Sequence, residues 1–290
     1  MLNIEEGIRS SPSFNKLEIG DLLFAEFTCP TATPKQASWT PTDYLVHVTS
    51  GRKTWHTADG VWAAKYGDTL FFRKGASIAE QFFDADFCLL MFFVPDNLIK
   101  NTVRELAATL GAPTTRTEPM KPIVRVENDV ALSAFFQSMR AYFSGHEKPS
   151  EPLLRLKLKE LIVSILTSGR NPVLAAYFRS FINRDAPSVP EIMEANYRFN
   201  LSLDEYAQLC HRSLSSFKRD FRNHFQATPA RWLLQKRLNH AAALFRSTQL
   251  NVTEIVFESG FKDVSHFSRV FKKRFGVTPK AFRQASPTPK

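Results

Sequence analysis

Phenylalanine recurs at every fourth position near the C-terminal end of the chain, in the stretch GFKDVSHFSRVFKKRFGVTP at residues 260–279. Residues four apart lie on one face of an α-helix, so Phe267, Phe271 and Phe275 form a single apolar stripe. Serine, histidine, arginine and lysine occupy the rest of the circumference. The pattern predicts a helix with one face in a core and a basic opposite face. Basic faces are usually only solvated, so a role for this one needs support from elsewhere in the chain.

The same pattern occurs a second time, 50 residues upstream, in SLSSFKRDFRNHFQATPARW at residues 213–232. Three phenylalanines of this stretch align with the first three, and Trp232 aligns with Phe282. The aligned phenylalanines are Phe217, Phe221 and Phe225. Two copies with the same basic outer face indicate a duplicated helical unit, not a chance arrangement.

A shorter amphipathic segment precedes each copy, at residues 201–210 and 251–260. In the first, Ser202 is the expected N-cap and Glu205 stands at the capping-box position. Each unit is therefore helix, tight turn, second helix, which is the outline of a helix-turn-helix whose second helix enters the DNA major groove. Residues 229–249 predict one long helix between the units. The two second helices would then reach successive major-groove turns, about 34 Å apart on one face of the duplex.

The run TEIVFESGFKDVSHFSRVFKKRFGVTPKAFR at residues 253–283 resembles the signature of the AraC/XylS family of transcriptional regulators. Residues 188–284 resemble the whole DNA-binding domain of that family, with its two helix-turn-helix units. Two positions depart from the family pattern. Val256 stands where the family usually has alanine, and His211 stands where the first unit usually has a turn glycine. Histidine is strained at a positive-φ position, so the first unit is the less certain in geometry.

The outward positions near the start of each second helix are expected to face the groove, and the resemblance implies that they contact bases. These positions are Ser215, Lys218, Arg219, Ser265, His266 and Arg269. Arginine can grip a guanine through O6 and N7, although phosphate contact is the alternative for both arginines. Further along the helices, Arg222, Lys272 and Lys273 are expected to neutralise phosphates. The expected core consists of Phe217, Phe221, Phe225, Gly260, Phe267, Phe271 and Phe275.

Residues 17–95 show short alternating apolar segments separated by turns with glycine. In one of them Tyr44, Val46 and Val48 alternate with Leu45, His47 and Thr49. Many short strands with glycine turns indicate a sandwich or a cupin-like jelly-roll barrel. The fold class expected for the whole chain is α+β, with this barrel and its flanking helices followed by an all-α double helix-turn-helix domain.

The stretch GDTLFFRKG at residues 67–75 resembles the second cupin motif, which raises the alternative of a cupin-type small-molecule enzyme with a basic tail that associates with DNA or membrane. A catalytic metal would need imidazole and carboxylate ligands at matching spacing. Ile78 occupies the motif's histidine position, and His47 and His56 do not form the expected pair. Cys29, Cys88 and Cys210 are too widely spaced to predict a disulfide framework or a zinc site. We therefore expect no metal, no cofactor, no catalytic residue and no enzyme.

Helical patterns follow the barrel at residues 96–111, 126–145 and 151–169. The last has a wide apolar face that either packs against the barrel or forms the seam of a homodimer. The dimer candidates on it are Leu154, Leu158, Leu161 and Ile165. The expected organisation is a regulatory and dimerisation domain at 1–170, a linker helix and linker at 171–187, and the DNA-binding domain at 188–285.

The first half also resembles the N-terminal domain of ExsA-type activators of type III secretion, through the segments YLVHVTSGRKTWHT, YGDTLFFRKGA and LLMFFVPDNLIKNTVREL. This resemblance implies control by a protein partner or by self-association, whereas arabinose-type relatives bind a small molecule in the barrel. An activator must also contact RNA polymerase. The effector, the operator and the sign of regulation stay open at this point.

Charge separates the two halves of the 290-residue chain. Residues 186–290 hold 17 Lys and Arg against 8 Asp and Glu, whereas residues 1–185 hold 21 against 20. A basic module attached to a neutral domain is typical of double-stranded DNA as partner. The basic residues are interleaved with a core pattern, which disfavours a membrane surface. No apolar run is long enough to span a bilayer and no signal pattern opens the chain, so a cytoplasmic protein is expected. These features together predict a sequence-specific transcriptional activator, controlled through its N-terminal domain.

Overall fold

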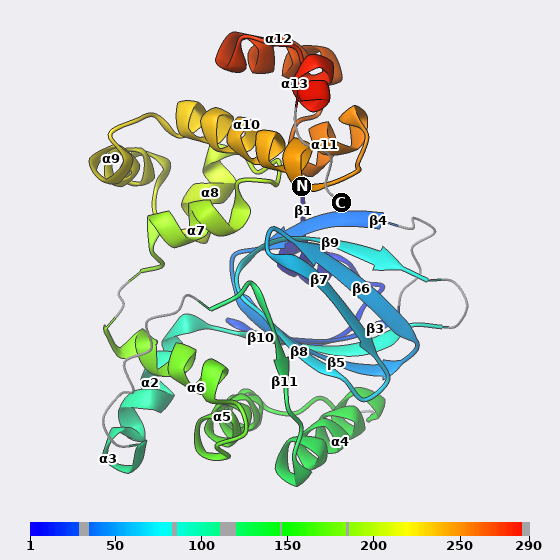
Figure 1. Ribbon diagram of the computed structural model, residues 1–290. Coiled ribbons are helices and arrows are strands. Elements are labelled where there is room, and N and C mark those ends of the chain that lie inside the picture. The colour runs from blue at the N-terminus through cyan, green and yellow to red at the C-terminus, as the bar shows by residue number, and fades with distance from the viewer. Residues whose placement is uncertain (29–34, 83–85, 111–119, 146, 184–185, 286–290) are drawn as a thin grey trace. The chain divides into compact units, whose positions relative to one another are not determined.

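The computed structural model describes residues 1–28, 35–82, 86–110, 120–145, 147–183 and 186–285 (Figure 1). The chain divides into two compact units, Met1–Ala186 and Pro187–Lys290. The first is built on two β-sheets with helices, and the second is entirely helical in its described part. The α+β class expected from the sequence is confirmed.

Two sheets form the centre of the first unit. The five-stranded sheet has the order β1 (Leu2–Asn3), β4 (Lys35–Thr40), β9 (Gly75–Gln81), β6 (Arg52–Thr57) and β7 (Gly60–Lys65). The six-stranded sheet has the order β11 (Ile123–Val126), β8 (Thr69–Phe72), β5 (Asp43–Ser50), β10 (Cys88–Val94), β3 (Leu22–Thr28) and β2 (Asn15–Ile19). Among the strand pairs in the described residues, β1 with β4 is parallel and the others are antiparallel.

Strand β5 is covered on both faces, as its alternating pattern predicts. Tyr44 and Val46 point into the core between the two sheets. Leu45 points the other way, into a second core beneath the helices, where His47 stacks on Phe136 with ring centroids 4.0 Å apart. Successive side chains of a strand alternate between faces, so the six-stranded sheet serves two hydrophobic layers at once.

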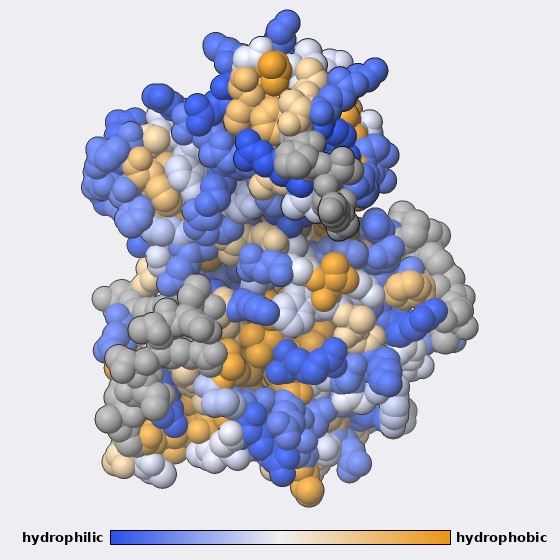
Figure 2. All heavy atoms as spheres, in the orientation of Figure 1, coloured by the Kyte–Doolittle hydropathy of each residue, from blue (hydrophilic) through white to orange (hydrophobic). Residues whose placement is uncertain are grey.

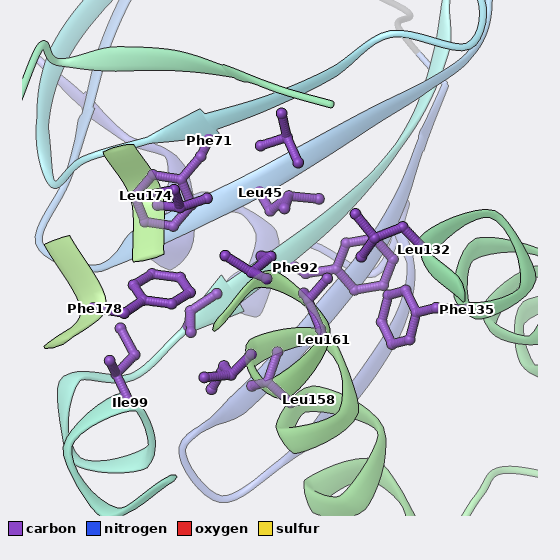
Figure 3. Packing of buried hydrophobic residues seen from close by; sticks show 14 of the residues in the cluster. Leu45, Phe71, Phe92, Ile99, Leu132, Phe135, Leu158, Leu161, Leu174 and Phe178 are labelled. Carbon is purple, nitrogen blue, oxygen red and sulfur yellow. The ribbon is translucent and has the colours of Figure 1, made fainter. Parts of the chain in front are cut away.

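Helices cover the outer face of the six-stranded sheet (Figure 3). The helices of the first unit are α1 (Ile4–Ser10), α2 (Asp96–Glu105), α3 (Ala107–Leu110), α4 (Val130–Ser144), α5 (Glu151–Thr167), α6 (Pro172–Ser180) and the 3₁₀ turn η1 (Phe181–Asn183). Side chains of α2, α4, α5 and α6 share one cluster with strand residues such as Phe71 and Phe92. Among the described residues, no single helix could span a bilayer on length and apolarity; α5 with Pro172–Asn183 meets these criteria only as a pair bent by 117°.

The four dimer candidates on α5 require a correction. Leu154, Leu158, Leu161 and Ile165 are at most 1% exposed and belong to the core of their own protomer. Figure 3 shows Leu158 and Leu161 directed at the same cluster as Phe92. A second subunit cannot reach these side chains, because the sheet already covers the apolar face of α5. The alternative, packing against the barrel, is what the structure shows.

The segment expected to be a linker, residues 171–187, also differs from expectation. Its helix α6 places Leu174 and Phe178 in the core of the first unit, each 1% exposed. Tyr177 donates a hydrogen bond to the buried carboxylate of Asp43 on β5, at 2.8 Å between the oxygens. Burial raises the pKa of Asp43. Helix α6 is therefore anchored to the barrel by apolar and polar contacts.

The second unit contains seven helices in its described residues. They are α7 (Val189–Asn196), α8 (Leu203–Leu209), α9 (Leu214–Phe225), α10 (Pro229–Ser247), α11 (Val252–Glu258), α12 (Val264–Phe275) and α13 (Pro279–Ala285). The pairs α8–α9 and α11–α12 are the two helix-turn-helix units, and α10 is the long helix between them. All five helices were expected from the hydrophobic pattern.

Candidate nucleic-acid interface

Each helix-turn-helix unit begins with a complete capping box. The side chain of Ser202 accepts from the backbone of Glu205, whose carboxylate accepts in return from the Ser202 backbone, and Asn251 with Glu254 repeats the arrangement on α11. Capping satisfies N–H groups that otherwise have no partner in the helix. The expected N-cap at Ser202 is confirmed.

The phenylalanine ladder forms the core of each unit. Phe217, Phe221, Phe267 and Phe271 are fully buried, and Phe225 and Phe275 are partly buried. The ladder ends in the same way in both copies: Phe225 packs on Trp232 at 5.0 Å between ring centroids, and Phe275 packs on Phe282 at 5.5 Å. The structural equivalence of the 50-residue repeat thus extends beyond the second helices to α10 and α13.

Gly260 lies in the turn of the second unit with φ +83°. A Cβ at this position would lie 2.5 Å from the carbonyl oxygen of Arg198, so the site excludes a side chain by contact as well as by backbone conformation. The corresponding residue of the first helix-turn-helix unit is His211, with φ 52° and an exposed side chain. The first turn therefore has the geometry of a glycine turn without the glycine, and the helix-turn-helix forms in spite of this substitution.

Val256 is fully buried and packs in the core of the second unit, so the larger side chain in place of alanine is accommodated. Helix α10 contacts the segment between α7 and α8 through Arg237, whose guanidinium donates to the carbonyl oxygens of Tyr197 and Phe199 at 2.6 and 2.7 Å. Burial lowers the pKa of Arg237. These contacts fix α10 to the residues that precede α8, while Phe245 of α10 packs in the second core.

The six residues predicted to read bases are all exposed on α9 and α12. The predicted phosphate-binding residues Arg222, Lys272 and Lys273 are exposed as well. Arg274, which the prediction left out, is exposed next to Lys273 and could have been included from the run of three basic residues. Figure 2 shows mostly hydrophilic residues over α9. The structure thus brings the predicted contacts onto the outer faces of two helices whose opposite faces are buried.

The two faces are similar but not identical. Lys218 on α9 corresponds to Ser268 on α12, and His266 on α12 corresponds to Ser216 on α9. Helix α12 has four Lys and Arg residues and no acidic residue, whereas α9 has three and also contains Asp220. A pair of helices with different exposed side chains can recognise two different base sequences.

The two histidines in the described part of the sheet-based unit, His47 and His56, have side-chain partners. His47 lies 2.9 Å from Thr69 through Nδ1, and burial, followed by the charge of Arg140, lowers its pKa to about 4. His56 lies 2.7 Å from Glu80 through Nε2. Within the described ranges no three His, Cys, Asp or Glu side chains are grouped so as to hold a metal ion. Cys88 and Cys210 are free thiols, and Cys29 lies outside the described residues.

A cavity of about 250 Å³ lies in the first unit, and its walls come from both sheets and from the N-terminal segment. Most lining residues are apolar, including Trp55 and Met91. Lys53 also lines it, although this residue is only 8% exposed, and its Nζ lies 5.2 Å from the ring centroid of Phe27 and 4.9 Å from that of Phe87. The sequence pattern does not predict this cavity, because its residues come from seven separate segments.

Comparison with known proteins assigns both halves of the chain. Residues 43–177 match the ExsA N-terminal regulatory domain, and residues 206–285 match a helix-turn-helix domain. The virulence regulon transcriptional activator VirF of Yersinia enterocolitica is 24% identical over 242 residues, covering 83% of this chain and 89% of VirF. The regulator ExsA of Pseudomonas aeruginosa is 25% identical over 235 residues, covering 81% and 83%. The activator RhaS of an Enterobacter species is 34% identical over 92 residues, covering 32% and 33%.

Two helix-turn-helix units with basic outer faces, attached to a separate sheet-based unit, define a DNA-binding transcriptional regulator. More particularly, the chain has an ExsA-type N-terminal regulatory domain and a helix-turn-helix domain of the AraC type, as its sequence resemblances predicted.

Proposed function

We propose that this protein is a cytoplasmic, sequence-specific transcriptional activator in which each subunit reads two adjacent major-groove elements. The observation that carries the proposal is the repeated recognition surface: α9 and α12 have the same buried ladder and exposed arginines at equivalent positions, Arg219 and Arg269. Helix α10 packs against both helix-turn-helix units and holds them at a fixed separation. Arg219 and Arg269 contact bases, and Arg222, Lys272 and Lys273 contact phosphates.

Selection of bound sequences from a random duplex library, using the full-length protein, tests this proposal. Two short preferred elements one helical turn apart are expected. Affinity for the selected duplex should then exceed that for a scrambled duplex at both 50 and 200 mM salt, although both fall as salt rises. If no sequence is enriched and all affinity is lost at the higher salt, the protein binds only through charge and the proposal is wrong.

Activation requires a productive contact with RNA polymerase, and the likeness to relatives named as activators supports it. Transcription with purified polymerase from a promoter next to the selected duplex should increase when the protein is added. A decrease would indicate a repressor. The same preparation, with and without the duplex, can be sized by light scattering to test the expected homodimer, for which the buried leucines of α5 provide no surface.

We also propose that the activity of the protein is controlled through the sheet-based unit, Met1–Ala186, either by a protein partner or by a ligand in its cavity. A 150 Å³ apolar cavity suffices for benzene, so the cavity here admits a somewhat larger molecule. Its Lys53 favours a ligand with one acidic group. Benzoate should therefore raise the melting temperature of the full-length protein more than the neutral benzamide, and Lys53→Met should remove the difference. Equal rises with both compounds would exclude a role for Lys53, and no rise with either compound would favour the protein partner.

A further inference from the structure

The two helix-turn-helix turns are built differently. The turn between α8 and α9 spans Cys210–Ser213, whereas that between α11 and α12 spans Ser259–Asp263 and is one residue longer. In each, the residue after the positive-φ position donates its backbone N–H to a carbonyl of the preceding helix: Arg212 to Ala207 at 2.9 Å, and Phe261 to Val256 at 3.1 Å. Arg212 and Phe261 therefore occupy equivalent positions, although one is charged and the other is aromatic.

Phe261 fixes its turn through the core. Its side chain is 6% exposed and meets Phe267 of α12 edge to face, with ring centroids 4.9 Å apart. The ring thus joins the turn to the recognition helix by burial. Lys262, the additional residue of this turn, is exposed.

Arg212 fixes its turn through polar contacts. One terminal nitrogen, Nη1, donates to the carbonyl oxygens of Cys210 and Pro187, both at 2.8 Å, and Nε donates to the carboxylate of Asp220 at 2.9 Å. Cys210 lies in the turn, Pro187 is the first residue of the helical unit Pro187–Lys290, and Asp220 lies on α9. A guanidinium can hold such divergent acceptors because its donors are fixed in a plane.

Asp220 is the only acidic residue of α9, and the equivalent position of α12 is Val270. A carboxylate on a helix that faces phosphates weakens binding to DNA, so its presence requires a compensating role. Asp220 pairs with Arg212 and also lies 3.6 Å from Nε of Arg219, the arginine proposed to read a base. It therefore stands between the arginine of the turn and the arginine of the recognition surface.

We propose that Arg212 and Asp220 are positioning residues that set the orientation of α9 and hence the base preference of the first helix-turn-helix unit. The inference rests on the proposed function, because it specifies how one of the two elements is read. The ion pair replaces the aromatic anchor that the second unit has in Phe261. Through Pro187, it also joins the start of the DNA-binding unit to α9 by hydrogen bonds.

Base preference measured separately for the two elements tests this role, with full-length protein and single-base variants of the selected duplex. Arg212→Ala should reduce discrimination in the first element about tenfold and leave the second element unchanged. Lys262→Ala is the matched control, since it also removes one positive charge from a turn, and it should lower affinity without changing either preference. If Arg212→Ala discriminates between bases of the first element as well as the wild-type protein does, the proposal is wrong.

Asp220→Asn separates positioning from loss of folding. The variant removes a negative charge from the DNA-facing helix, so affinity for a scrambled duplex should rise, while discrimination at the first element falls. An unfolded unit would lose both. Equal losses at both elements in Arg212→Ala and Asp220→Asn would also overturn the proposal, because they would indicate a general defect. If the unmodified protein shows no base preference at all, the proposed function itself fails, and this inference fails with it.

Discussion

Gly260 and His211 have equivalent positions in the two turns but different tolerance for a side chain. In Gly260→Ala the new Cβ would meet the carbonyl oxygen of Arg198 at 2.5 Å in a left-handed conformation, so we expect a loss of about 3 kcal/mol or more in unfolding free energy. His211→Gly removes strain but adds freedom to the unfolded chain, so stability should stay within about 1 kcal/mol of wild type. Denaturant unfolding of both variants provides the comparison; similar losses in the two would contradict the distinction.

Arg269 and Lys273 test the assignment of base and phosphate contacts on one helix. Arg269→Ala should relax preference at one base position of the second element, with a loss of about 1–3 kcal/mol in discrimination. Lys273→Ala should weaken binding to every duplex alike and reduce the salt slope by about 1. Binding titrations against matched and single-base-variant duplexes measure both effects. A uniform loss in both variants would show that Arg269 contacts only phosphate.

His47 should make the stability of the sheet-based unit fall in acid. Its folded pKa of about 4 lies below the ordinary value of 6.5, so between these pH values the unfolded chain binds a proton that the folded chain does not. Stability should therefore fall as pH drops from 6.5 toward 4, by up to about 3 kcal/mol from this residue. In His47→Gln the difference in unfolding free energy between pH 7 and pH 4.5 should shrink; an unchanged difference would contradict this role of His47.

At the level of single elements, the ladder of α12 should decide whether the second helix-turn-helix folds. Phe271 is fully buried and its ring contacts those of Phe245, Phe267, Phe275 and Phe282. Phe271→Ala should cost about 3–5 kcal/mol in the stability of the second unit. Calorimetry of the full-length protein should show one transition lowered and that of the sheet-based unit unchanged. The exposed neighbour Lys272→Ala should shift neither transition.

How well each element could be predicted depended on where its contacts come from. The helices of the second unit were predictable, because 3.6-residue periodicity and capping residues are local signals. Strands β4 and β9 have a weaker local signal, since KQASWT and GASIAEQ contain few large apolar residues and are stabilised by pairing with each other. The apolar face of α5 was recognised, but a helix pattern cannot say whether a sheet or another subunit covers it.

The candidate site divides in the same way. The exposed faces of α9 and α12 followed from periodicity alone, and the family resemblance supplied their role. The contacts of Arg212 did not follow, because Pro187 is 25 residues away along the chain and approaches only in the folded unit. A charged residue in a turn is ordinarily solvated, and nothing in its sequence neighbourhood marks it as a structural contact.

On the scale of the whole molecule, the two units have separate cores and very different charge. A fragment of residues 187–290 should therefore fold alone and bind the selected duplex with nearly the salt slope of the full-length protein, because the first unit adds a net charge of only about +1. Circular dichroism and binding titrations at several salt concentrations test this expectation. A much smaller slope for the fragment would mean that the first unit also contacts DNA.

The matching ends of the two phenylalanine ladders have a consequence for engineering. Each recognition helix finishes in the same kind of aromatic socket, with Trp232 in one copy and Phe282 in the other. Outward-facing residues can therefore be transplanted between α9 and α12 without disturbing what holds either helix. The turns are not interchangeable in this sense, since one depends on an arginine and its acidic partner and the other on a buried ring. A designer who moves a turn must move its anchor with it.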